Sequence, residues 1–215
     1  MKQGLTEIVI ILDRSGSMGS LVRDTIGGYN AFLDSQRSLP GEARVTTVLF
    51  DDKYEILHNG ANIRDIKPIT RNEYFARGST ALLDAVGKTI NDVGARLSST
   101  DESERPDKII FVITTDGQEN SSREFTYDQI HQMITHQQEK YNWEFLFLGA
   151  NIDAAREAEN LGISAKKSAK YAASAIGTAA LFSTVANSVA CFRQTGVVDE
   201  DWSKGIDKAE KKKSK

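Results

Sequence analysis

Oxygen-bearing side chains follow an apolar segment near the start of the chain. Residues 8–12 read IVIIL, and Asp13, Ser15 and Ser17 come directly after them, with a glycine between the two serines. Carboxylate and hydroxyl oxygens are the ligands that hard divalent cations prefer. If the backbone curls round an ion here, residues two apart point the same way, and the glycine lets the chain come close. The stretch therefore predicts part of a metal site.

Two later segments carry the same chemistry. RGSTALLDAV places Thr80 at the start of a predicted helix, and FVITTDGQEN ends a predicted strand with Thr115 and Asp116. In an open α/β sheet, the carboxyl ends of neighbouring parallel strands meet in one crevice. We therefore expect a single site whose oxygen donors are Asp13, Ser15, Ser17, Thr80 and Asp116.

This donor set favours Mg²⁺, with Mn²⁺ or Ca²⁺ as substitutes. Mg²⁺ binds about six oxygens and keeps several of its waters, whereas zinc sites are rich in nitrogen and sulfur ligands, which this set lacks. Two carboxylates at most neutralise the ion, and the other ligands are neutral hydroxyls. Such a metal stays electrophilic and can accept an acidic ligand from outside. The alternative is that the serines cap a helix that begins near Ser20 and that the aspartates merely end strands.

The same motifs argue against catalysis. An aspartate after the first strand also occurs in haloacid-dehalogenase-type phosphatases, but their second aspartate, two residues later, is replaced by Ser15 here. The segment TTDGQEN offers no lysine, and the serine-hydrolase motif G-x-S-x-G does not occur. We therefore expect a binding protein and not an enzyme, and keep a magnesium-dependent phosphatase or phosphotransferase as the alternative.

Alternating strand-like and helix-like segments must position these side chains. Near-continuous apolar runs are typical of parallel strands buried on both faces, and apolar residues at helical spacing are typical of amphipathic helices. Strands are predicted at 7–12, 44–50, 54–58, 108–114 and 143–148, with a short last strand in KYAAS at 170–174. Helices are predicted at 21–38, 81–97, 126–140, 153–160 and 177–192. Thr126 and Gln129 form a capping-box pattern at the start of the third helix.

This alternation predicts an α/β fold with an open, mostly parallel sheet and helices on both faces. VTTVLFDDKYEIL differs, because two alternating runs meet at 51–53, which indicates a hairpin and an antiparallel strand at a sheet edge. Asp51 and Asp52 are interpreted as turn residues of this hairpin. Residues 1–198 are expected to form the domain, and residues 199–215, which end in KAEKKKSK, to form a flexible charged tail.

The composition is that of a soluble globular chain and implies no charged partner. Hydrophobic residues make up 40% and charged residues 27%, and the formal net charge of -3 favours neither nucleic acid nor a membrane surface. The stretch AALFSTVANSVACF is too short for a bilayer span, which takes about 20 residues. The single cysteine, Cys191, is interpreted as a small buried side chain, and a reducing, cytoplasmic location is expected.

The three motifs resemble the metal-ion-dependent adhesion site (MIDAS) of von Willebrand factor type A (VWA) domains. They are D-x-S-x-S after the first strand, G-S-T at a helix start and T-D-G after the fourth strand, in that order. The resemblance implies a Rossmann-like sheet of six strands with one antiparallel edge strand. It also implies that Ser15, Ser17 and Thr80 bind the ion directly, and that Asp13 and Asp116 hold it directly or through water.

The resemblance, which covers about residues 5–192, further implies a protein partner. In VWA domains an Asp or Glu of a partner fills the remaining metal position, and a shift of the last helix can change affinity. The segment LGANIDAAREAENLGI after the fifth strand resembles stand-alone VWA proteins of bacteria and phages. We therefore expect a metal-dependent protein-protein interaction module with no nucleic acid or membrane partner. The alternative is a structural subunit of a larger complex, whose metal ties loops together.

Overall fold

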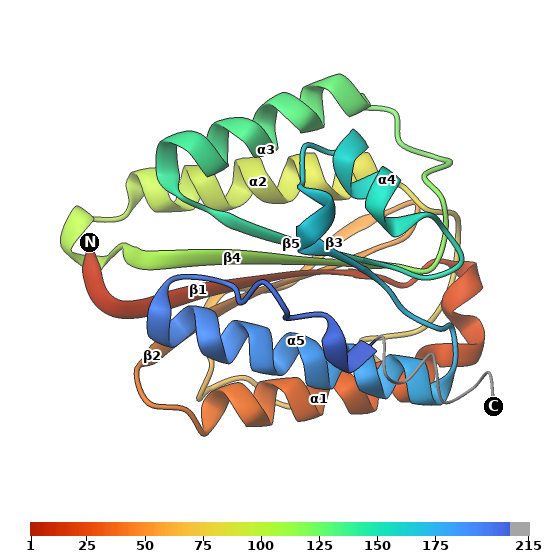
Figure 1. Cartoon of the computed structure of the whole chain (residues 1–215), viewed down its shortest axis with the longest axis horizontal. Coiled ribbons are helices and arrows are strands. Elements are labelled where there is room, and N and C mark those ends of the chain that lie inside the picture. Colours follow the sequence, from red (N-terminus) through yellow and green to blue (C-terminus); the bar gives the residue numbers. More distant parts are fainter. Residues whose placement is uncertain (207–215) are drawn as a thin grey trace.

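The computed structural model describes residues 1–206 and shows a central sheet between two layers of helices (Figure 1). Among these residues, the sheet has six strands in the order β3-β2-β1-β4-β5-β6. The strands are β1 (Lys2–Asp13), β2 (Glu42–Phe50), β3 (Tyr54–Asn62), β4 (Pro106–Thr115), β5 (Glu144–Gly149) and β6 (Ser168–Lys170). The α-helices are α1 (Val22–Arg37), α2 (Leu82–Ser99), α3 (Tyr127–Tyr141), α4 (Ala154–Asn160) and α5 (Ala175–Thr195). The predicted fold class is confirmed.

Strand β1 shows why the central segments are apolar without a break. It pairs in parallel with β2 on one side and with β4 on the other. Ile8, Ile10 and Leu12 join the core beneath α1 and α5. Val9 and Ile11 join the second core, beneath α2, α3 and α4. Because both faces of the strand are buried along residues 8–12, each of these positions favours an apolar side chain.

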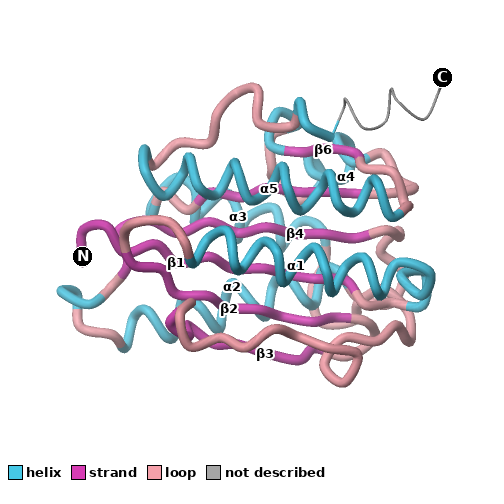
Figure 2. The backbone as a smooth tube through the Cα atoms, turned by 90° about the horizontal axis from the view of Figure 1, so that it is seen from below, coloured by secondary structure: helices cyan, strands magenta, loops and turns pink. Residues whose placement is uncertain are grey.

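Helix α5 is a core element of this fold. It is the one helix within residues 1–206 that is long and apolar enough to cross a membrane, with a mean hydropathy of 1.5. Here, however, it lies beside α1 on one face of the sheet, where Leu181 and Val185 are buried (Figure 2). The ring of Phe182 occupies the space above Gly28 of α1, where an added Cβ would lie 2.2 Å from a ring carbon. This contact explains the glycine inside α1.

Two local predictions are confirmed. Strands β2 and β3 form an antiparallel pair at one edge of the sheet, and the chain reverses at 51–53. Helix α3 begins with the predicted capping box, because the Thr126 side chain accepts from the Gln129 N–H while the Gln129 side chain accepts from the Thr126 N–H.

Three predictions near the carboxyl end are wrong. The last strand is not 170–174 but β6, which pairs with β5 only as far as Gly149, where β5 itself ends. Cys191 is half-buried and not fully buried, since it lies near the end of α5 with its Sγ 3.7 Å from the Val197 carbonyl oxygen. The predicted tail also begins too early.

Residues 199–206 pack onto the domain. Val198, Trp202 and Ile206 are buried, and the indole Nε1 of Trp202 donates a 2.9 Å hydrogen bond to the carbonyl oxygen of Lys166. These apolar residues stand singly among charged ones, so the sequence did not reveal that they are buried. The rest of the predicted tail, 207–215, lies outside the described residues.

Candidate metal centre

The candidate site, called the crevice below, lies at the carboxyl ends of the neighbouring strands β1 and β4. These strands are neighbours, but the chain continues from β1 toward β2 on one side and from β4 toward β5 on the other. Such a reversal of strand order is where open α/β sheets form binding sites. Both strands end on the right in Figure 1. Asp13 is the last residue of β1, and Asp116 follows the last residue of β4.

Asp13 is fully buried, and each of its carboxylate oxygens accepts a hydrogen bond. The Ser15 N–H donates to Oδ1 at 2.7 Å, and the Thr115 hydroxyl donates to Oδ2 at 2.6 Å. The Tyr74 hydroxyl donates to the main-chain carbonyl oxygen of Asp13 at 2.5 Å. The carboxylate is therefore oriented by Ser15 and Thr115, while Tyr74 holds the backbone of the same residue. The sequence motif contained Thr115 but did not reveal that it orients Asp13.

The two serines connect Asp13 to Asp116. The hydroxyl oxygens of Ser15 and Ser17 lie 3.0 Å apart, and the Ser17 hydroxyl donates to Asp116 Oδ1 at 2.5 Å. Ser15 is buried, whereas Ser17 is exposed at the mouth of the crevice. A continuous path of polar contacts thus runs from the end of β1 to the end of β4, as the alternating D-x-S-x-S pattern predicts.

Thr80 approaches the same place from the loop before α2. A Cβ added to Gly117 would lie 3.4 Å from Thr80 Oγ1 and 3.6 Å from Ser17 Oγ, so both hydroxyls border Gly117. The Thr80 N–H donates to Asn120 Oδ1 at 2.9 Å, and the Asn120 N–H donates to the Thr80 carbonyl oxygen at 3.1 Å. The structure therefore brings all five predicted donors to one crevice.

The loop after β4 is fastened to the start of α2. The carboxylate of Asp84 accepts hydrogen bonds of 2.9–3.0 Å from the N–H groups of Arg123, Glu124 and Phe125. Glu119 in turn accepts from the Leu83 N–H at 3.0 Å, and so caps α2. This loop carries Asp116 at one end, and the start of α2 follows Thr80, so these bonds fix the two donors relative to each other.

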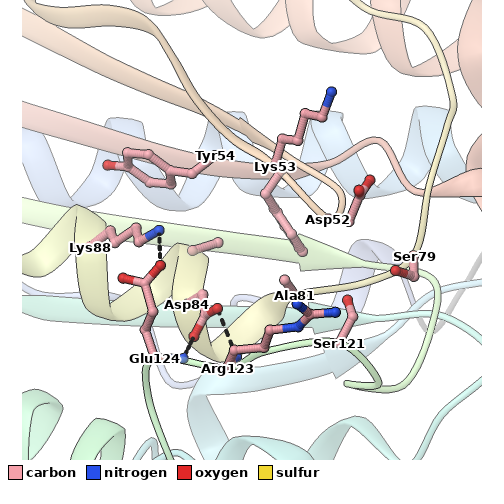
Figure 3. A pocket seen from close by; sticks show the side chains of 12 residues that line it. Asp52, Lys53, Tyr54, Ser79, Ala81, Asp84, Lys88, Ser121, Arg123 and Glu124 are labelled. Carbon is pink, nitrogen blue, oxygen red and sulfur yellow. Dashed lines mark hydrogen bonds and ion pairs between the residues drawn. The ribbon is translucent and has the colours of Figure 1, made fainter.

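A cavity of about 320 Å³ lies beside this junction, lined by residues of the hairpin, the start of α2 and the loop after β4. Figure 3 shows Asp84 facing the backbone of Arg123 and Glu124, and Lys88 paired with Glu124 at 2.7 Å. The charged residues that line the cavity are three cationic and three acidic ones, namely Lys53, Lys88, Arg123, Asp52, Asp84 and Glu124. The cavity therefore has no dominant charge.

A buried ion cluster supports the first motif, and the sequence interpretation missed it. Arg14, between Asp13 and Ser15, is fully buried, and its Nε donates to Asp51 Oδ2 at 2.9 Å. The Nε of Arg77 donates to the same oxygen at 2.7 Å. Asp51 was interpreted as a turn residue, but it is fully buried and holds two segments of the site. Burial alone would raise the pKa of Asp51, yet the hydrogen bond from Arg77 and the charge of Arg14 lower it.

Backbone hydrogen bonds join the same segments of the site. The Gly16 N–H donates to the Gly78 carbonyl oxygen at 3.0 Å, and the Ala81 N–H donates to the Asp51 carbonyl oxygen at 3.0 Å. Gly78 has a φ of +65°, and a Cβ there would lie 2.0 Å from Asp52 Oδ1. The glycine of the G-S-T motif is therefore required by the hairpin beside it.

The pKa values of the two site carboxyls are raised, which favours the binding of a cation. Burial raises the pKa of Asp13 from 3.8 to about 6, although the hydrogen bonds from Thr115 and Ser15 favour its charged form. Burial also raises the pKa of Asp116, against the hydrogen bond from Ser17. A raised carboxyl pKa means that the charged form lacks sufficient compensation in the protein alone. A divalent cation would supply that compensation, so the donor set fits the predicted metal.

Within residues 1–206, no group of three or more His, Cys, Asp or Glu side chains could hold a metal ion. A site that depended on such ligands would therefore have to include residues outside this range. The crevice differs from that type, because it combines two carboxylates with three hydroxyls. This composition suits a hard cation that retains water ligands.

The sequence matches no protein-family model and no curated protein. Solved structures do match the fold, and they include VWA domains. The VWA domain of the type V pili tip protein Mfa5 from Porphyromonas gingivalis is 11% identical, with a TM-score of 0.60 over 91% of this chain and 98% of that one. This likeness supports the fold, which is Rossmann-like and of the VWA type.

Two other similar structures are of proteins that hold a metal. Proximal thread matrix protein 1 from the mussel byssus, with a zinc-occupied MIDAS motif, is 16% identical, with a TM-score of 0.59 over 86% of this chain and 46% of that one. Manganese-loaded TRAP protein from Plasmodium vivax is 15% identical, with a TM-score of 0.58 over 79% of this chain and 69% of that one. The chain spans less than half of the mussel protein.

Proposed function

We propose that this protein is a metal-dependent protein-binding module. A divalent cation, Mg²⁺ in the cell, is held in the crevice and binds the carboxylate of an Asp or Glu from a partner protein. The residues that hold the cation are Asp13, Ser15, Ser17, Thr80 and Asp116. The observation that carries the proposal is the contact between Ser17 and Asp116, which joins two strand ends through oxygen atoms alone at 2.5 Å.

The charge of the donor set supports a carboxylate as the incoming ligand. Asp13 and Asp116 supply two negative charges when both are ionised, and the three hydroxyls supply none. A cation held in this way is not over-neutralised, so an additional anionic ligand remains favourable. Mn²⁺ and Ca²⁺ also bind oxygen ligands and would replace Mg²⁺ in experiments.

The similar structures support the same proposal. Two of them hold zinc or manganese, and another is a domain of a pili tip protein. If this chain uses its crevice in a comparable way, it binds proteins and performs no reaction. Within the described residues, no histidine or lysine makes a hydrogen bond or ion pair with the five donors, so a general base is not evident among them.

A pair of matched variants tests the metal site. Thr80→Ala removes a proposed ligand, whereas Ser79→Ala removes the hydroxyl of its exposed neighbour. Calorimetric titration with Mg²⁺ and Mn²⁺ should show one site per chain in the wild-type protein and in Ser79→Ala. The site should be weakened at least about tenfold in Thr80→Ala and lost in Asp13→Ala. Equal metal binding in all four proteins would overturn the proposal.

A synthetic peptide tests the second part of the proposal, which is the binding of a carboxylate to the metal. We expect a glycine-serine peptide with one glutamate to shift amide NMR signals of the crevice residues in Mg²⁺ but not in chelator. A Glu→Gln version of the peptide should cause no such shifts. Metal binding without any carboxylate binding would favour the structural alternative, in which the ion ties loops together. Phosphatase turnover that is lost in Asp13→Asn would favour the enzyme alternative.

We also propose a cytoplasmic location and a bacterial or phage origin. A single cysteine suits a reducing compartment, because no internal disulfide can form. Cell fractionation with an antibody against the protein tests the location. Recovery of the protein from the medium or from a membrane fraction would contradict it.

A further inference from the structure

A groove lined by two arginines lies near the crevice. We infer that an arginine groove, formed by Arg23, Arg71 and Phe75 with Gly19 and Ala76 at its side, binds a second carboxylate of the partner. The groove has a volume of about 310 Å³. The inference rests on the proposed function and deepens it, because it makes the partner an acidic segment with two carboxylates, one on the metal and one in the groove.

The groove and the metal site are built from the same two segments of the chain. Gly19 and Ser17 belong to the same short 3₁₀ helix, Gly16–Leu21. On the other wall, Ala76 precedes the segment that leads to Thr80, and its Cβ lies 4.0 Å from the place of a Cβ on Gly19. The Arg77 N–H donates to the Arg14 carbonyl oxygen at 2.9 Å and holds the two walls together. A peptide that binds the metal would therefore extend along these shared segments into the groove.

The charge of the groove is positive. Its lining contains two arginines, Arg23 and Arg71, and no acidic residue. Both arginines are exposed, and within residues 1–206 neither guanidinium makes a hydrogen bond or an ion pair. Other arginines of this region are engaged, since Arg14 and Arg77 both bind Asp51. The two groove arginines are thus available for an anion from outside.

The ring of Phe75 forms an apolar wall of the groove. Phe75 is 40% exposed, which is unusual for a large apolar side chain beside a polar crevice. Its ring centroid lies 5.5 Å from the Arg14 guanidinium carbon and 5.1 Å from that of Arg77. These contacts hold the ring from the protein side by cation–π attraction and leave its other edge to a ligand. An apolar side chain between the two acidic residues of a partner would pack there.

A carboxylate is the anion that these features favour. Guanidinium groups bind carboxylates through two parallel hydrogen bonds, which a flexible acidic side chain can reach from a peptide backbone. The adjoining metal site selects a carboxylate in the same segment. A nucleic acid would need a longer basic track, whereas the formal net charge of the chain is -3. We therefore commit to an acidic peptide as the occupant.

Peptide titrations followed by NMR in Mg²⁺ test the inference. The probes are glycine-serine peptides with one glutamate, and peptides with two glutamates separated by two, four or six residues. In at least one spacing, the second glutamate should strengthen binding about tenfold or more, and its replacement by glutamine should remove the gain. Arg71→Glu and Arg23→Glu should each abolish the gain while Mg²⁺ affinity and binding of the one-glutamate peptide stay within about twofold. Lys140→Glu is the matched control, because this exposed lysine near the end of α3 lies on the opposite face of the sheet from α1 and close to the start of β5.

The outcomes separate the two proposals. If the one-glutamate peptide binds with metal and a second glutamate adds nothing at any spacing, the groove proposal is wrong and the proposed function stands. A gain that persists in Arg71→Glu and Arg23→Glu also overturns the groove proposal. Tighter, arginine-dependent binding of a single-stranded oligonucleotide would replace the acidic peptide by a nucleic acid. If no peptide binds in Mg²⁺, both proposals fall.

Discussion

The hydroxyl of Ser17 donates a hydrogen bond of 2.5 Å to Asp116 Oδ1, although the two residues are 99 positions apart in the chain. This contact lies where β1 and β4 end, and it joins the first and third motifs. Because the pKa of Asp116 is raised by burial, its charge is insufficiently compensated in the protein alone. The contact therefore marks a place where a cation would be stabilising.

The variant Asp116→Asn should weaken metal binding without weakening the fold. Without metal, this variant should unfold at the same temperature as the wild type or slightly above it, because a costly buried charge is removed. In excess Mg²⁺ the wild type should gain about 2–3 kcal/mol, as expected when ligand is about 100 times its Kd. The variant should gain far less. Thermal unfolding with and without Mg²⁺ measures both effects, and equal stabilisation of the two proteins contradicts the assignment.

Metal affinity should fall at low pH. The pKa of Asp13 in the metal-free protein is about 6, so below this value a cation must displace a proton. Between about pH 7.5 and about pH 5, this single group should weaken Mn²⁺ binding about tenfold. Calorimetry in two buffers of different ionisation enthalpy should also detect proton release near pH 6. An affinity that does not change across this range would show that Asp13 is not protonated there.

The metal-free protein should show the opposite trend in stability. A carboxyl whose folded-state pKa is raised favours folding fully below its unfolded value of 3.8. That contribution is lost as the pH rises through the folded value of about 6. The loss amounts to at most about 3 kcal/mol for a shift of this size. Urea unfolding of wild type and Asp13→Asn in chelator, across this range, should show the pH dependence in the wild type and a smaller one in the variant.

Asp51→Ala should be strongly destabilising. It removes the buried one of the two carboxylates that pair with the fully buried Arg14, and breaking such a buried pair costs about 3–5 kcal/mol. Asp52→Ala removes the exposed neighbouring carboxylate and should change stability by no more than about 0.5 kcal/mol. Urea unfolding of the two variants gives the comparison. Similar values for both would restore the interpretation of Asp51 as a simple turn residue.

Trp202→Ala should also destabilise the protein, because the indole is buried and bonded to the Lys166 carbonyl oxygen. Truncation of a buried aromatic side chain costs about 3–5 kcal/mol. Lys204→Ala, in the same segment, removes an exposed side chain and should be nearly neutral. Thermal unfolding distinguishes the two, and a neutral Trp202→Ala would support the original prediction of a free tail from residue 199.

The sequence was sufficient for the features that depend on local pattern. The apolar run of β1 indicated burial on both faces, and the alternating runs on either side of 51–53 indicated the hairpin. The site donors could be grouped because sheet topology brings strand ends together, and the three motifs each follow or precede such an end. The metal-binding role of these donors remains a prediction.

Features that depend on distant partners could not be predicted in this way. Whether an aspartate in a turn faces solvent or a buried arginine depends on residues 37 positions away, as Asp51 and Arg14 show. The carboxylate of Asp84 likewise looks like an ordinary helix residue until the loop after β4 folds over it. Trp202 was masked by the charges around it, which suggested a solvated tail.

The buried Arg14 limits how far the first motif can be transplanted. A protein engineer who grafts Asp13–Ser17 onto another α/β scaffold would bring a guanidinium that this protein neutralises with Asp51 and Glu55, both from the neighbouring hairpin. In a host without such carboxylates, the unpaired guanidinium would distort the grafted segment even in the absence of a cation. A portable version would need either the hairpin as well or an uncharged residue in place of Arg14.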